Sequence, residues 1–135
     1  MSGEILLNPR LVVEKLNRAI NLHDLDAMVD CFDPLYHGEQ PLHPDRAYRG
    51  REQIHKEWGN IFKRLPDFHA ENVRIAADQE TVWTEARWTG TLAGKGKIEI
   101  LGVIVFGVRN NRVTWTRIYM DSLQKPGTGL DVLPR

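Results

Sequence analysis

Residues 97–123 read KIEILGVIVFGVRNNRVTWTRIYMDSL, and this stretch decides the fold. The pattern predicts two long strands, 98–108 and 113–123, joined by a turn at Asn110-Asn111. Asn tolerates the left-handed backbone that a tight two-residue hairpin needs, so the turn has a physical cause. The stretch is therefore expected to form a long β-hairpin.

The register of this hairpin decides which side chains share a face. If the two Asn residues alone form the loop, Arg109 faces Arg112 and every later pair follows. One face then carries Ile98, Ile100, Gly102, Ile104, Phe106, Trp115, Arg117, Tyr119 and Asp121. The other face carries Leu101, Val103, Val105, Thr114, Thr116, Ile118 and Met120.

Both faces are too apolar to lie bare in water, whereas a sheet covered on one side alternates apolar and polar residues. We therefore expect the chain's own helices on the first face and a second subunit on the other. On the first face Asp121, Arg117 and Tyr119 sit in an apolar field. A few polar groups converging in an apolar concavity are typical of a small-molecule pocket.

The length of 135 residues points to one domain over residues 1–135. Helices followed by an antiparallel sheet make it an α+β domain, with an irregular tail at 125–135. Eighteen basic and eighteen acidic residues give zero formal net charge, which argues against a nucleic-acid partner. No apolar run is long enough to span a membrane, and no leader pattern is present, so the cytoplasm is expected. The lone Cys31 is interpreted as a buried structural thiol.

Three helices are expected before the sheet. Asn8-Pro9 opens the first, Asp24 caps the second, and Gly50 and Pro66 bound the third. A short edge strand at 35–41 lies between the second and third helices. Strands at 68–77 and 81–92 precede the hairpin, and either a two-residue or a three-residue loop fits Gly94-Lys95-Gly96. The two-residue loop places Trp83, Glu85 and Arg87 on the pocket face. The three-residue loop places Val82, Thr84, Ala86 and Trp88 there.

The order of these motifs resembles the nuclear transport factor 2 superfamily and, within it, the SnoaL-like polyketide cyclase group. The matching stretches are HDLD with Phe32, YRGREQI at 48–54, LPD at 65–67, RWTGT at 87–91, and Phe106 through Tyr119-Met120-Asp121. The resemblance implies a cone-shaped α+β barrel, with three helices packed in a strongly curved antiparallel sheet. It also implies a homodimer through the convex sheet face. Cyclases, isomerases, dehydratases, epoxide hydrolases and non-catalytic binders all use this fold.

The resemblance also carries site residues. Ketosteroid isomerase-like members place a Tyr and two acids where this chain has Leu16, Gln40 and Ile104, so that chemistry is not expected. The Arg-x-Asp pair of limonene epoxide hydrolase-like members has no counterpart either. Cyclase-like members place a catalytic acid where this chain has Asp121. The alternative interpretation is that Asp121 and Arg117 form an ordinary ion pair or cap the mouth of the barrel.

These observations predict a cofactor-independent enzyme that moves a proton next to a carbonyl of a small apolar or polycyclic compound. Asp121 is the expected acid or base, with Arg117, Tyr119 or His37 holding the oxygen. The expected pocket walls include Leu16, Gln40, Trp58, Ile104 and Trp115. His37 and Glu39 lack a specific metal-ligand spacing, so no metal is expected. The alternative function is a non-catalytic binding or dimerisation module.

Overall fold

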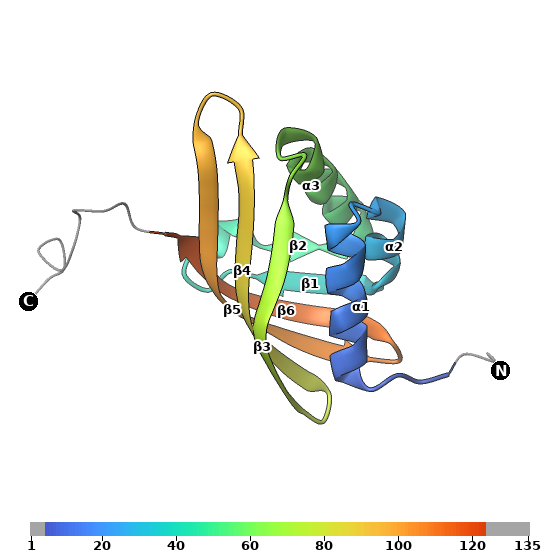
Figure 1. Cartoon of the computed structure of the whole chain (residues 1–135). Coiled ribbons are helices and arrows are strands. Elements are labelled where there is room, and N and C mark those ends of the chain that lie inside the picture. The colour runs from blue at the N-terminus through green and yellow to red at the C-terminus, as the bar shows by residue number, and fades with distance from the viewer. Residues whose placement is uncertain (1–4, 124–135) are drawn as a thin grey trace, which may run out of the picture.

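The structure is a computed structural model that describes residues 5–123, and Figure 1 shows the arrangement of its elements. One six-stranded sheet in the order β2-β1-β6-β5-β4-β3 curls around the helices. In chain order the elements are α1 (Pro9–Asn21), α2 (Leu25–Asp30), β1 (Phe32–Glu39), the 3-10 helix η1 (Pro44–Arg46), β2 (Tyr48–Arg49), α3 (Gly50–Arg64), β3 (His69–Asp78), β4 (Thr81–Leu92), β5 (Gly96–Arg109) and β6 (Arg112–Ser122). The predicted α+β architecture is confirmed, whereas the predicted tail at 125–135 lies outside the described residues.

The helix starts follow from local capping chemistry. The side chain of Asn8 accepts a hydrogen bond of 2.9 Å from the Arg10 N–H, and Pro9 occupies the first helical position. Asp24 caps α2 by accepting from the Ala27 N–H at 3.1 Å. Each bond satisfies a backbone donor that the helix leaves unpaired. Both predicted starts are confirmed.

The sheet contains one parallel pair. Strands β3 to β6 form an antiparallel meander, and β1 then pairs with β6 in parallel. We expected an edge strand at 35–41, but β1 begins at Phe32 and lies between β6 and the two-residue strand β2. The edge is therefore β2, because the chain returns after η1 to cover that side of β1.

The β5–β6 hairpin turns where it was predicted to turn. Asn110 and Asn111 have φ angles of 52° and 63°, and Arg109 pairs with Arg112. The register then shifts between Gly107 and Val108, because Val108 pairs with Val113 while Gly107 pairs with Trp115. Residue 114 is the extra residue of a β-bulge.

This bulge overturns the predicted faces of β6. Ile104 pairs with Ile118 rather than Arg117, and Leu101 pairs with Asp121. Because side chains alternate along a strand, a one-residue shift exchanges the two faces. The concave face therefore receives Thr116, Ile118 and Met120, and the convex face receives Trp115, Arg117, Tyr119 and Asp121.

Two contacts join the strands at the bulge. The Trp115 indole lies so close over Gly107 that a Cβ atom on Gly107 would overlap the ring. The Thr114 hydroxyl also donates to the Gly107 carbonyl at 3.2 Å. A residue without a side chain is thus needed opposite the Trp.

The β4–β5 turn resolves the alternative that the sequence left open. Leu92 pairs with Gly96, so Ala93, Gly94 and Lys95 form a three-residue loop. Val82, Ala86 and Trp88 consequently face the concave side, where Val82 and Ala86 are buried. Trp83, Glu85 and Arg87 lie on the convex side.

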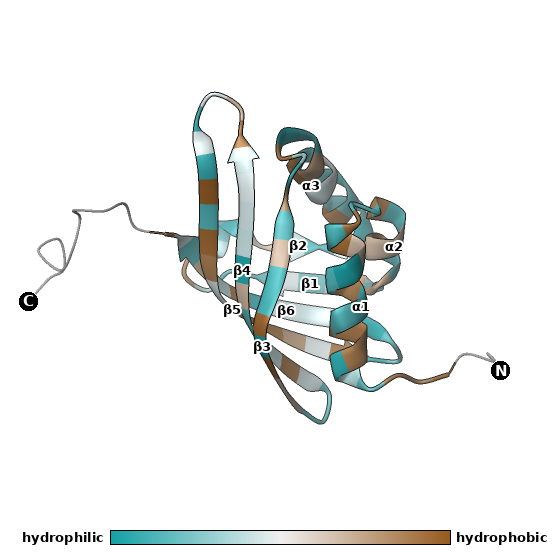
Figure 2. Ribbon diagram, in the orientation of Figure 1, coloured by the Kyte–Doolittle hydropathy of each residue, from teal (hydrophilic) through white to brown (hydrophobic). Residues whose placement is uncertain are grey.

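The core fills the space between the concave face and the three helices, which lie together on one side of the sheet (Figure 1). Hydropathy alternates along α1, whose buried stripe includes Val12, Val13 and Leu16 (Figure 2). Cys31 is buried in this core, and burial raises the pKa of its thiol. Within residues 5–123 no helix has the length and apolar character needed to cross a membrane.

Gly102 allows β5 and β6 to approach each other closely. A Cβ atom at residue 102 would collide with the Tyr119 carbonyl oxygen and lie 2.7 Å from the Met120 Cα. Backbone atoms cannot swing aside, so we expect Gly102→Ala to lower the free energy of unfolding by about 2–3 kcal/mol. Urea denaturation measures this quantity.

Gly90→Ala on the neighbouring strand is the matched control, because its Cβ would lie 3.4 Å from the Leu65 Cβ, an ordinary contact. This control is expected to cost under about 1 kcal/mol. Equal effects of the two substitutions would contradict the close approach at Gly102.

Candidate ligand-binding cavity

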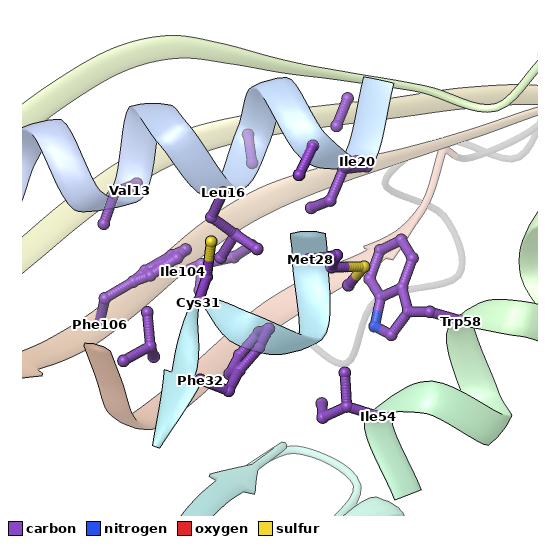
Figure 3. Close-up of a cluster of buried hydrophobic side chains, with 14 of the residues drawn as sticks. Val13, Leu16, Ile20, Met28, Cys31, Phe32, Ile54, Trp58, Ile104 and Phe106 are labelled. Atoms are coloured by element: carbon purple, nitrogen blue, oxygen red, sulfur yellow. The ribbon is translucent and has the colours of Figure 1, made fainter. Parts of the chain in front are cut away.

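A cavity of about 230 Å³ lies between the helices and the concave face of the sheet. Figure 3 shows Leu16 from α1, Met28 from α2, Trp58 from α3 and Ile104 from β5 within one cluster of buried side chains, and all four line this cavity. Its apolar wall consists of Leu16, Ile20, Met28, Phe32, Ile54, Trp58, Ile61, Trp88, Ile100, Ile104, Phe106, Ile118 and Met120. Trp58 and Trp88 meet edge to face, with ring centroids 5.5 Å apart.

Few polar side chains reach the cavity, and the charged ones are exposed. Tyr36, Gln40, Tyr48 and Thr116 belong to the wall. The exposed lining residues Arg46, Asp121 and Ser122 mark the opening, between η1 and the end of β6. Within the described residues the interior thus presents hydroxyl and amide groups but no charge.

Tyr36 and Thr116 form a buried hydroxyl pair in the wall. Their oxygens are 2.6 Å apart, and the two residues are only 2% and 4% exposed. Burial raises the pKa of Tyr36 to about 12, although the hydrogen bond with Thr116 acts in the opposite direction. The phenol therefore keeps its proton at physiological pH and remains able to donate.

Gly38 leaves room for the hydroxyl pair, because it has no side chain. It lies two residues after Tyr36 on the same face of β1 and pairs with Thr116 of β6. A Cβ atom at residue 38 would collide with the Tyr36 hydroxyl and lie 2.9 Å from the Thr116 hydroxyl oxygen. The bare glycine backbone thus leaves the space in which the two hydroxyls meet.

Four of the predicted site residues lie in the cavity wall. They are Leu16, Gln40, Trp58 and Ile104. Trp58 is the largest of them and contributes an indole ring from α3. Their roles in binding a ligand stay predictions.

Four other predicted residues lie away from this cavity. Trp115, Arg117 and Tyr119 are on the convex face because of the bulge at Gly107. On the convex face, one guanidinium nitrogen of Arg117 lies 2.9 Å from a Glu39 carboxylate oxygen. The Arg117 Nε–H donates a hydrogen bond to the Tyr119 hydroxyl at 3.1 Å. His37 is exposed, on the side of β1 opposite to Tyr36 and Gly38.

Asp121 lies at the border between the cavity and the convex face of the sheet. It pairs with Leu101 on the convex side and is exposed, and it also borders the cavity opening. One of its carboxylate oxygens accepts from the Ser122 N–H at 2.8 Å. The alternative interpretation of an Asp121–Arg117 ion pair is wrong, because Arg117 pairs with Glu39.

Sequence reasoning missed Tyr36 and Thr116. Successive side chains of a strand point to opposite faces, so Tyr36, Gly38 and Gln40 share one face, and His37 and Glu39 share the other. The prediction that Gln40 lines the pocket therefore implies that Tyr36 lines it too and that His37 does not. Among residues 5–123 no group of three His, Cys, Asp or Glu side chains is arranged to hold a metal ion.

Solved structures share this fold at low sequence identity. A candidate SnoaL-like polyketide cyclase from Shewanella putrefaciens CN-32 aligns with a TM-score of 0.75 and 13% identity, over 87% of this chain and 92% of its own. The epoxide hydrolase/cyclase-like enzyme SalBIII, of pyran ring formation in polyether salinomycin, aligns with a TM-score of 0.74 and 19% identity, over 84% and 90%. An LEH-like epoxide hydrolase of M. tuberculosis aligns with a TM-score of 0.72 and 23% identity, over 84% and 82%.

No curated protein matches this chain in sequence. The solved structures support the cone-shaped fold, and a sequence match supplies the family. Residues 13–116 match the SnoaL-like domain family, and the chain therefore belongs to it.

Proposed function

We propose that this protein binds a small, largely apolar and uncharged molecule in the cavity between its helices and its sheet. The main support for the proposal is the cavity wall, which is mostly apolar, contains only a few uncharged polar side chains, and has its charged residues, Arg46 and Asp121, at the opening. An apolar concavity with a few placed polar groups is the usual form of a small-molecule site.

Tetralin, a bicyclic hydrocarbon without hydrogen-bonding groups, is a suitable first probe. We expect it to bind and to raise the unfolding temperature in a concentration-dependent way, since a ligand of the folded state stabilises by mass action. The Trp58 and Trp88 rings in the wall supply a fluorescence signal for the same titration. Absence of any binding by tetralin would contradict the proposal.

Ile118→Trp tests whether the probe occupies this cavity. Ile118 is half-buried in the wall, so the larger side chain is expected to fill the space and weaken tetralin binding at least tenfold. Leu11→Trp is the control, because Leu11 is 48% exposed on α1 and outside the cavity. Unchanged affinity in Ile118→Trp would place the probe elsewhere.

Proton transfer next to a carbonyl is a second candidate function, because Asp121 borders the cavity opening. The SnoaL-like fold and its likeness to an epoxide hydrolase and to an epoxide hydrolase/cyclase-like enzyme support an enzymatic role of this general kind. Arg117, Tyr119 and His37 lie away from the cavity, so Asp121 alone carries this proposal.

Exchange of the α-protons of 2-tetralone in D₂O, followed by NMR, tests this second function. If Asp121 is the base, the wild type accelerates the exchange, and Asp121→Asn is expected to lower this acceleration at least tenfold. Asp26→Asn, an exposed acid on α2, is expected to match the wild type. Absence of acceleration by the wild type would exclude this function and leave binding as the proposal.

We also propose a homodimer through the convex face of the sheet. Trp83, Leu101, Val103 and Tyr119 are each 37–40% exposed on this face, and Val103 pairs with Tyr119. The ion pairs Arg74–Glu85 and Arg87–Glu99, both 2.6 Å, neutralise the charges beside them. Exposed apolar side chains gathered on one face are typical of a protein interface.

Leu101→Asp is expected to convert this dimer into a monomer, because it places a charge in the apolar patch. Light scattering after size-exclusion chromatography measures the molecular mass. Leu11→Asp makes the same substitution at an exposed position on α1 and should leave the mass unchanged. A monomeric wild type, or a dimer unaffected by Leu101→Asp, would overturn the proposed interface.

A further inference from the structure

The hydroxyl pair in the cavity wall has more donors than acceptors supplied by the protein. Tyr36 and Thr116 each carry one O–H, and the single hydrogen bond between them uses only one of the two hydrogens. Among the described residues neither hydroxyl has a further hydrogen-bond partner. Whichever residue donates, one buried O–H is left over.

A leftover donor at this site is costly unless something accepts it. Burying a hydroxyl hydrogen away from water without a partner costs about 1–3 kcal/mol. Both residues are more than nine-tenths buried, and both line the cavity. The acceptor that satisfies the remaining hydrogen therefore has to enter the cavity.

Gly38 and Gln40, which follow Tyr36 on the same face, contribute to this part of the cavity. A side chain at Gly38 would occupy the position of the Tyr36 hydroxyl, so the glycine holds open the space in which the pair forms. Gln40, the next residue on the same face, also lines the cavity. Its half-buried carboxamide has no partner among residues 5–123 and supplies a second polar contact beside the pair.

We propose that the Tyr36–Thr116 hydroxyl pair donates a hydrogen bond to an uncharged oxygen acceptor, a carbonyl or ether oxygen, on the molecule that the cavity binds. This inference rests on the proposed binding function and adds the chemical class of the ligand. An uncharged oxygen fits because the charged lining residues Arg46 and Asp121 are at the opening. An ionised group beside the pair would have no opposite charge to compensate its lost hydration.

The test compares 1-tetralone, which carries one carbonyl oxygen, with tetralin, which has the same bicyclic frame without it. The measured quantity is the ketone preference, defined as the Kd of tetralin divided by the Kd of 1-tetralone. Comparing this ratio between protein variants cancels the different hydration of the two probes. Intrinsic fluorescence titration gives both constants.

Two variants form a matched pair. Tyr36→Phe leaves the Thr116 hydroxyl with a free hydrogen and is expected to keep most of the ketone preference. Tyr36→Phe combined with Thr116→Val, a nearly isosteric change, removes the last donor and is expected to lower the preference about tenfold. Thermal unfolding without probe checks that both variants are folded.

A measurement on the wild type is independent of any substitution. The carbonyl stretching band of bound 1-tetralone is expected at a lower frequency than in hexane, because donation to the oxygen weakens the C=O bond. A hexane-like band, or an unchanged ketone preference in the double variant, would overturn the inference. If the probes bind but the double variant leaves the ketone preference unchanged, cavity binding stands and this inference fails, whereas if neither probe binds, both fail.

Discussion

One extra residue in β6 determines what the cavity contains. Thr114 lies between Val113, which pairs with Val108, and Trp115, which pairs with Gly107. Without this bulge, Arg117 and Asp121 would face the core, and Thr116 would lie on the convex side. The close contact of the Trp115 indole with Gly107 therefore affects the chemistry of a cavity that it does not touch.

Much of the fold follows from chemistry that is local in the sequence. The caps at Asn8 and Asp24, the turn at Asn110-Asn111 and the three helices were all predictable, because each depends on a few neighbouring residues. The place of β1 was not predictable in this way. Its parallel pairing with β6 joins segments about 80 residues apart, and no local pattern encodes such a pairing.

The site was predictable only in part, for two physical reasons. A register built outward from the turn carries any error along the entire strand, so the missed bulge misplaced Trp115, Arg117 and Tyr119 together. The alternation within 115–121 contained a correcting signal, because Arg117 and Asp121 share one face while Ile118 and Met120 share the other. Strand β1 held a similar signal, since Gln40 and His37 cannot face the same side.

The parallel pairing of β1 with β6 also sets an order of events during synthesis. Tyr36 leaves the ribosome 80 residues before Thr116, so β1 lacks this neighbour until β6 emerges. Until then β5 carries an unpaired edge, and the two parts of the sheet cannot join. Pairings between such distant segments slow folding, and the growing chain must keep this edge from aggregating until β6 arrives.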